Sequence, residues 1–74
     1  MQDIKEKQVY FFVLCTATFA KEKNISLVYA FNYLCEYKGM DFLIDCYDAE
    51  HTLSINDVVD DITLVCKNNG GSIE

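Results

Sequence analysis

The chain has 74 residues and a formal net charge of −6, because six Lys stand against twelve Asp and Glu. No Arg is present, 51% of the residues are apolar and 14% are aromatic. This composition excludes a disordered chain, which is poor in apolar residues, and a non-specific nucleic-acid binder, which needs a basic surface. No apolar stretch reaches the roughly 18 residues of a membrane-spanning helix. We therefore expect one domain over residues 1–74, with no nucleic acid and no membrane as partner.

The first expected helix covers residues 3–22. A strand over residues 9–14 is the competing interpretation, because these side chains are β-branched or aromatic, but the length of the apolar stretch favours a helix. One side carries apolar residues at helical spacing, namely Val9, Phe12, Val13, Thr16, Phe19 and Ala20. Tyr10, Phe11 and Leu14 fill the other sides. Since a helix this apolar is covered on more than one side, these three residues predict an oligomer interface, most simply that of a homodimer.

Residues 27–38 are expected to form the second helix. Asn24 suits the left-handed cap that ends the first helix, and Ser26 suits the N-cap of the second. Gly39 stands where a glycine commonly follows a helix end. The inward side is expected to carry five residues: Leu27, Ala30, Phe31, Leu34 and Cys35.

Two further helices are expected over residues 42–47 and 55–68. Asp41 and Ser54 are their expected N-caps, and a polar turn joins them. The earlier helix would turn Phe42, Leu43, Cys46 and Tyr47 inward. The later one has the clearest apolar stripe in the chain, made of Ile55, Val58, Val59, Ile62, Val65 and Cys66. Residues 70–74 are expected to form a mobile tail. The fold class is therefore all-α, a compact irregular bundle of about four helices.

Four cysteines are spread along the chain, with no closely spaced pair that would indicate a zinc site. Each falls on an apolar stripe, so we expect four reduced, buried thiols in a cytoplasmic protein: Cys15, Cys35, Cys46 and Cys66. Two disulfides in a secreted domain are the alternative. No signal peptide is recognisable, and no metal or other cofactor is expected.

The most polar candidate site is the turn that contains Asp48, His51 and Thr52. A carboxylate near the single His could orient a general base or help to bind a metal. The simpler hypothesis is a structural turn, in which His51 bonds to Asp48 or to a neighbouring backbone group. No activated nucleophile accompanies this His, because apolar burial makes a thiol inert.

Charge is distributed unevenly along the chain. Residues 1–40 hold five Lys against four acidic residues, whereas residues 41–74 hold one Lys against eight. Asp57, Asp60 and Asp61 are expected to face solvent together and to bind a basic surface, either on a protein partner or on a second copy. The same acidic residues argue against residues 55–68 as a DNA-recognition helix, since phosphates would repel them.

Several short segments of the sequence together resemble those of a known family. It comprises residues 41–48, then His51-Thr52 and residues 59–62, with upstream matches at Asn24-Ile25-Ser26, Ala30 and Tyr37-Lys38-Gly39. Over roughly residues 8–68 the chain resembles the short bacterial proteins grouped as domain of unknown function 3791. The resemblance implies no catalytic residues. Genes of this family often lie near ADP-ribosyltransferase-like genes, so the resemblance implies an antitoxin-like or accessory role.

We therefore expect a non-enzymatic protein–protein interaction domain, acting on itself or on the product of a neighbouring gene. The alternative is a small metal-binding or hydrolytic protein built on Asp48 and His51. A bound ion or an open pocket at His51 would favour the alternative.

Overall fold

The computed structural model describes the backbone of residues 3–73 and the side chains of residues 6–73. It confirms an all-α fold, with five helices in this part of the chain: α1 (Asp3–Lys23), α2 (Leu27–Glu36), α3 (Gly39–Asp45), α4 (Tyr47–Glu50) and α5 (Ile55–Asn68). No helix among these residues is long and apolar enough to cross a membrane.

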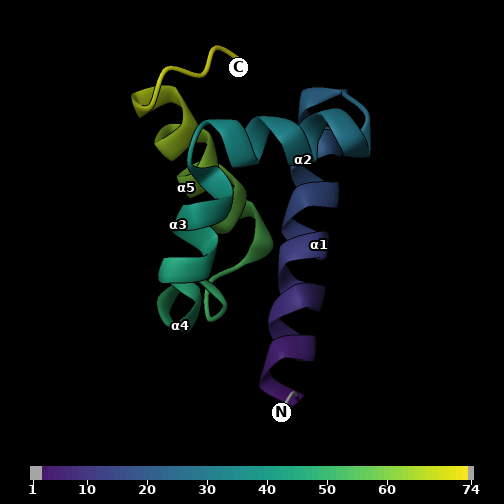
Figure 1. Cartoon of the computed structure of the whole chain (residues 1–74), viewed down its shortest axis with the longest axis vertical. Helices are drawn as coiled ribbons and strands as arrows, with labels where there is room; N and C mark the ends of the chain where they lie inside the picture. Colours follow the sequence, from purple (N-terminus) through teal and green to yellow (C-terminus); the bar gives the residue numbers. More distant parts are fainter. Residues whose placement is uncertain (1–2, 74) are drawn as a thin grey trace.

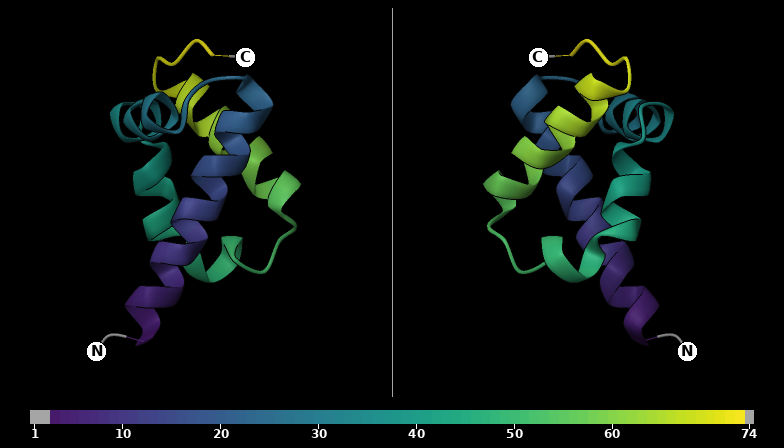
Figure 2. Two further views of the ribbon diagram at one scale, coloured as in Figure 1. Left: turned by 90° about the vertical axis from the view of Figure 1, so that its right-hand side faces the viewer. Right: turned by 90° about the vertical axis from the view of Figure 1, so that its left-hand side faces the viewer.

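The long helix α1 stands at one side of the molecule, and α2 crosses its C-terminal end (Figure 1). From α2 the chain turns into α3 and α4, and α5 returns to pack against both α3 and α1. The side views in Figure 2 show the first turns of α1 extending beyond the other helices. Among the described side chains of α1, Tyr10, Val13 and Leu14 are exposed on its outward side.

The helix ends follow the predicted capping residues closely. The Ser26 hydroxyl accepts a hydrogen bond from the Tyr29 backbone N–H at 3.0 Å, and the Ser54 hydroxyl accepts one from Asp57 at 3.2 Å. Asn24 adopts a left-handed conformation with φ 59°. Each cap satisfies backbone groups that the helix itself leaves free, so α1, α2 and α5 begin and end near the predicted positions.

The beginning of α3 differs from the prediction. Lys38, not Gly39, adopts the left-handed conformation (φ 74°), and Gly39 is the first residue of α3. A Cβ at Gly39 would lie 2.8 Å from both Cys66 Sγ and Leu34 Cδ2. Glycine is therefore needed here for close packing of α3 on α5 and α2, and the predicted start at residue 42 with Asp41 as N-cap is wrong.

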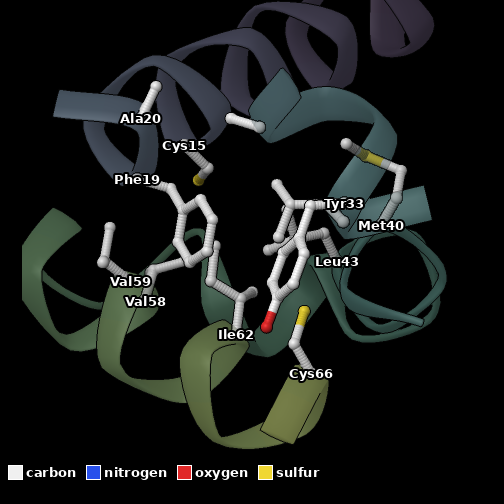
Figure 3. Packing of buried hydrophobic residues seen from close by; sticks show 12 residues of the cluster. Cys15, Phe19, Ala20, Tyr33, Met40, Leu43, Val58, Val59, Ile62 and Cys66 are labelled. Atoms are coloured by element: carbon white, nitrogen blue, oxygen red, sulfur yellow. The ribbon is translucent and has the colours of Figure 1, made fainter. Parts of the chain in front are cut away.

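One apolar core lies where α1, α2, α3 and α5 meet (Figure 3). The Phe19 and Tyr33 rings stack there with centroids 5.9 Å apart. The predicted stripe of α5 is confirmed, since Val58, Val59 and Ile62 are fully buried. The twelve buried apolar residues are Cys15, Phe19, Ala20, Ala30, Tyr33, Leu34, Met40, Leu43, Val58, Val59, Ile62 and Cys66.

The predicted inward side of α2 is partly wrong. Ala30 and Leu34 are buried as expected, but Leu27 and Phe31 are about half exposed, and Tyr33 takes the inward position. Relative to the predicted orientation, α2 is rotated about its own axis, because Tyr33 fits between Phe19 and the C-terminal segment. The Tyr33 hydroxyl accepts a hydrogen bond there from the Ile73 backbone N–H at 3.1 Å. The expected mobile tail covers residues 70–74, of which residues 70–73 lie back against α2 and residue 74 lies outside the described residues.

Among the four cysteines, all are free thiols. Cys15 and Cys66 are buried, Cys46 is half-buried and Cys35 is exposed on α2. The expectation of burial therefore fails for Cys35, again because α2 is rotated. Burial, reinforced by the charge of Glu50, raises the pKa of the Cys15 thiol to about 12.

Candidate interaction surface

The outward side of α1 is apolar over about two helical turns. Tyr10 is 71% exposed, Val13 54% and Leu14 43%, and Ala17 is also exposed. Charged residues border this stretch only at its two ends. A helix on the surface of a small domain normally places polar residues on this side, so the arrangement is typical of a helix that is covered by another molecule.

Phe11, the third residue predicted for the oligomer interface, lies on a different side of α1. It is half-buried, and its ring packs edge-to-face on Tyr47 of α4 with centroids 5.4 Å apart. Phe12 contacts the same tyrosine ring at 6.1 Å. Phe11 therefore helps to fix α4 on α1, whereas Tyr10 and Leu14 remain available at the surface.

A groove of about 480 Å³ runs beside this surface, between α1, α2 and α3. Val9 and Val13 line it from α1, while Val28 and Phe31 line it from α2. The full lining is Val9, Phe12, Val13, Thr16, Leu27, Val28, Phe31, Met40 and Ile44. The Thr16 hydroxyl is occupied by the Phe12 carbonyl at 2.7 Å. The groove therefore offers burial of apolar surface, and no free side-chain charge for chemistry.

Sequence reasoning missed the α2 and α3 walls of this groove. Leu27 and Phe31 were expected in the core, and Val28 and Ile44 were not singled out. Because α2 is apolar on most sides, its periodicity alone does not decide which side faces the core. One signal for this surface was present in the sequence. The segments that form α1 and α2 together hold more large apolar residues than a core of this size accommodates.

The turn around His51 is held mainly by backbone groups. His51 Nδ1 lies 2.7 Å from the Tyr47 carbonyl oxygen, and the imidazole stacks on the Tyr47 ring with centroids 4.6 Å apart. The Thr52 hydroxyl donates to the Ala49 carbonyl at 2.8 Å. His51 and Asp48 are both exposed. Of the two partners predicted for His51, the structure gives the backbone group rather than Asp48.

Glu50, at the end of α4, is the unexpected polar residue of the interior. Its side chain is only 7% exposed, and its Oε1 has no hydrogen-bond partner among the residues that the structure describes. Burial, a hydrogen bond with Asp61, and the charges of Asp61 and Asp57 raise the pKa of the Glu50 carboxyl to about 7. No sequence pattern distinguishes Glu50 from its exposed neighbours, because its burial depends on how α4 packs.

The three acidic residues of α5 do not form one uniform surface. Asp57 and Asp60 are exposed, but Asp61 is half-buried and lies next to Glu50. Within residues 6–73, no group of three or more His, Cys, Asp or Glu side chains is arranged to hold a metal ion. Asp57 and Asp60 are therefore the two members of the set that face solvent.

A comparison with protein-family models identifies the family of this chain. The family model described as protein of unknown function DUF3791 matches residues 10–69 of this chain. Neither the curated proteins nor the solved structures contain a match.

Proposed function

We propose that this chain, which belongs to the DUF3791 family, is a non-enzymatic protein–protein interaction domain. The observation that carries the proposal is the apolar surface formed by the outward side of α1 together with the adjoining groove. We call it the α1–α2 surface, and define it by Val9, Tyr10, Val13, Leu14, Ala17, Leu27, Val28 and Phe31. Exposed apolar surface of this continuity is costly in water and is stabilised when a partner covers it.

An interaction role also fits the chemistry of the polar residues. His51 is engaged with the Tyr47 carbonyl and ring, and the groove beside α1 is lined by apolar side chains. His51 is not among the residues that line this groove, whereas a hydrolytic site places a titratable group within its pocket. The partner would be either the product of a neighbouring gene, in an antitoxin-like or accessory role in the cytoplasm, or a second copy of the chain.

The acidic residues of α5 would act on the rate of association. Asp57 and Asp60 are exposed on a helix remote in sequence from the α1–α2 surface. Concentrated negative charge draws a basic partner toward the molecule over distances of about 8 Å at physiological ionic strength. Asp60→Asn should therefore slow association with a basic partner at low salt, and leave the dissociation rate nearly unchanged.

The proposal is tested by capturing the tagged chain, with its bound proteins, from its own host cells. Val28 is 71% exposed in the first turn of α2, where an acidic residue is compatible with the helix, so Val28→Asp should abolish specific capture without unfolding the domain. Leu64→Asp is the matched control, because Leu64 is 57% exposed on α5, outside the groove.

The readout is the identity of the proteins bound by the wild type and by Leu64→Asp but lost in Val28→Asp. Equal recovery by all three chains would contradict the proposed surface. Turnover of a substrate by the purified wild type, abolished by His51→Ala, would favour the hydrolytic alternative.

A further inference from the structure

Opposite charges lie at the two ends of the outward side of α1. Glu6 and Lys21 are both exposed, and between them the same side of the helix carries Tyr10, Val13 and Ala17. These five positions are separated by four, three, four and four residues, which keeps them on one stripe of an α-helix. At about 1.5 Å per residue, the stripe is about 22 Å long.

The stripe is complementary to itself when it is reversed. Glu6 is seven residues before Val13, and Lys21 is seven residues after Leu14. Tyr10 is three residues before Val13, and Ala17 is three after Leu14. An antiparallel copy centred between residues 13 and 14 therefore places each Glu6 opposite a Lys21. It also places each bulky Tyr10 opposite a small Ala17, so that large side chains meet small ones.

A parallel copy has the opposite consequence. It sets Glu6 against Glu6, Lys21 against Lys21 and Tyr10 against Tyr10, so that like charges and bulky groups coincide. The direction of the α1 axis reinforces the antiparallel choice, because antiparallel helices also align their dipoles favourably. The side views in Figure 2 show that the first turns of α1 protrude from the domain, which leaves this end accessible to a second molecule.

From this charge pattern we infer that the occupant of the outward side of α1 is a second copy of the chain, paired antiparallel about a two-fold axis between Val13 and Leu14. The inference rests on the proposed interaction function, and it names one partner and one register. The contact is isologous, since each protomer contributes the same residues. Its core is Val13 and Leu14 from both copies, and its rims are the two Glu6–Lys21 pairs.

The register is tested by exchanging charges and measuring the dimer dissociation constant by sedimentation equilibrium, from about 1 μM to about 500 μM protein at low salt. Glu6→Lys sets two lysines together at each rim, and Lys21→Glu sets two glutamates together. Each single variant should weaken the dimer by about tenfold, because two attractive pairs become repulsive. The double variant Glu6→Lys/Lys21→Glu restores opposite charges, and should return to within about threefold of the wild type.

A change in the stability of α1 would not restore dimer affinity in the double variant. Lys near the N-terminus and Glu near the C-terminus are both unfavourable to the α1 dipole, so the double variant has the weakest isolated helix of the set. Circular dichroism should show the same helical content in all four proteins. Glu36→Lys and Lys67→Glu are the charge-matched controls, because both residues are exposed outside α1, and neither should change the dissociation constant.

Each outcome bears on the register. Weakening by both single variants with recovery in the double variant supports the antiparallel pair. Single variants that dimerise like the wild type, or a double variant no tighter than either, would overturn it. If the register fails while Val28→Asp still abolishes specific capture of a protein from host cells, the proposed interaction function stands without it.

Discussion

The carboxyl of Glu50 on α4 lies next to that of Asp61 on α5, with Glu50 Oε1 buried and unpartnered. Cys15 of α1 is close enough for the Glu50 charge to raise its thiol pKa as well. Among the side chains of residues 6–73, no cationic group pairs with this carboxyl, which lies at the junction of α1, α4 and α5. Such a group is costly when it is ionised, since burial removes its hydration.

Stability should therefore depend on pH through Glu50. Its pKa rises from 4.5 to about 7 on folding, so the folded state binds more protons than the unfolded state between these values. The free energy of unfolding falls as pH rises through this window, and levels off above about 7. Glu50→Gln removes the charge, and should stabilise the protein by about 2 kcal/mol at pH 8 but by little at pH 4.

Urea unfolding at a series of pH values measures this difference. Glu36→Gln is the control, since Glu36 is exposed, and it should show no such pH-dependent gain. A Glu50→Gln variant whose advantage over the wild type stays constant between pH 4 and pH 8 would contradict the role given to the buried carboxyl.

The His51 turn contributes modestly to stability. The imidazole is exposed, but it bonds to the Tyr47 carbonyl and stacks on the Tyr47 ring. His51→Ala removes both contacts, and should lower the free energy of unfolding by about 1 kcal/mol. Urea denaturation checks this value. An unchanged unfolding midpoint would instead indicate that the imidazole is held for binding.

Gly39 is required by packing. An alanine Cβ there would lie 2.8 Å from Cys66 Sγ and from a methyl group of Leu34. Gly39→Ala should therefore destabilise the fold by about 1 to 3 kcal/mol. Adding Cys66→Ala removes one of the two close contacts, so the double variant should be less destabilised than the separate effects predict. Strict additivity in thermal unfolding would argue against this contact.

The reactivity of the thiols should show that α2 is oriented with Cys35 at the surface. Cys35 is exposed, whereas Cys15 and Cys66 are buried, and burial raises the pKa of both buried thiols. A chromogenic disulfide reagent at pH 8 should label Cys35 first, and should reach the two buried thiols only after unfolding. Cys46 is half-buried, so it is replaced by Ser in both proteins compared, and Cys35→Ser then removes the fast phase. A fast phase that persists in this variant would contradict the placement of Cys35.

How well the buried side of each helix could be predicted depends on how clearly its apolar and polar residues are separated. On α5 the apolar and polar residues lie on opposite sides, so the buried positions Val58 and Ile62 could be identified from spacing alone. On α1 and α2 apolar residues surround the helix, and spacing could not decide whether Tyr33 or Phe31 faces the core. Only the packing of α2 across α1 makes that choice.

Two features depended on contacts that local sequence does not reveal. Gly39 meets Cys66, which lies far along the chain, so its position resembled an ordinary helix-ending glycine. Glu50 is buried by the way α4 packs beside α1 and α5. By contrast, Tyr10 and Leu14 could be selected as surface residues, because a domain of 74 residues has too little interior for them.

The most direct test of the antiparallel α1 dimer is the mass of the chain in solution, measured by sedimentation equilibrium at about 100 μM. We expect twice the chain mass of 8.5 kDa for the wild type and for the control Leu64→Asp. Val13→Asp places a charge at the centre of the α1–α2 surface, and should return the molecule to the mass of one chain. A wild type of 8.5 kDa at every concentration, or a Val13→Asp variant as large as the wild type, would contradict it.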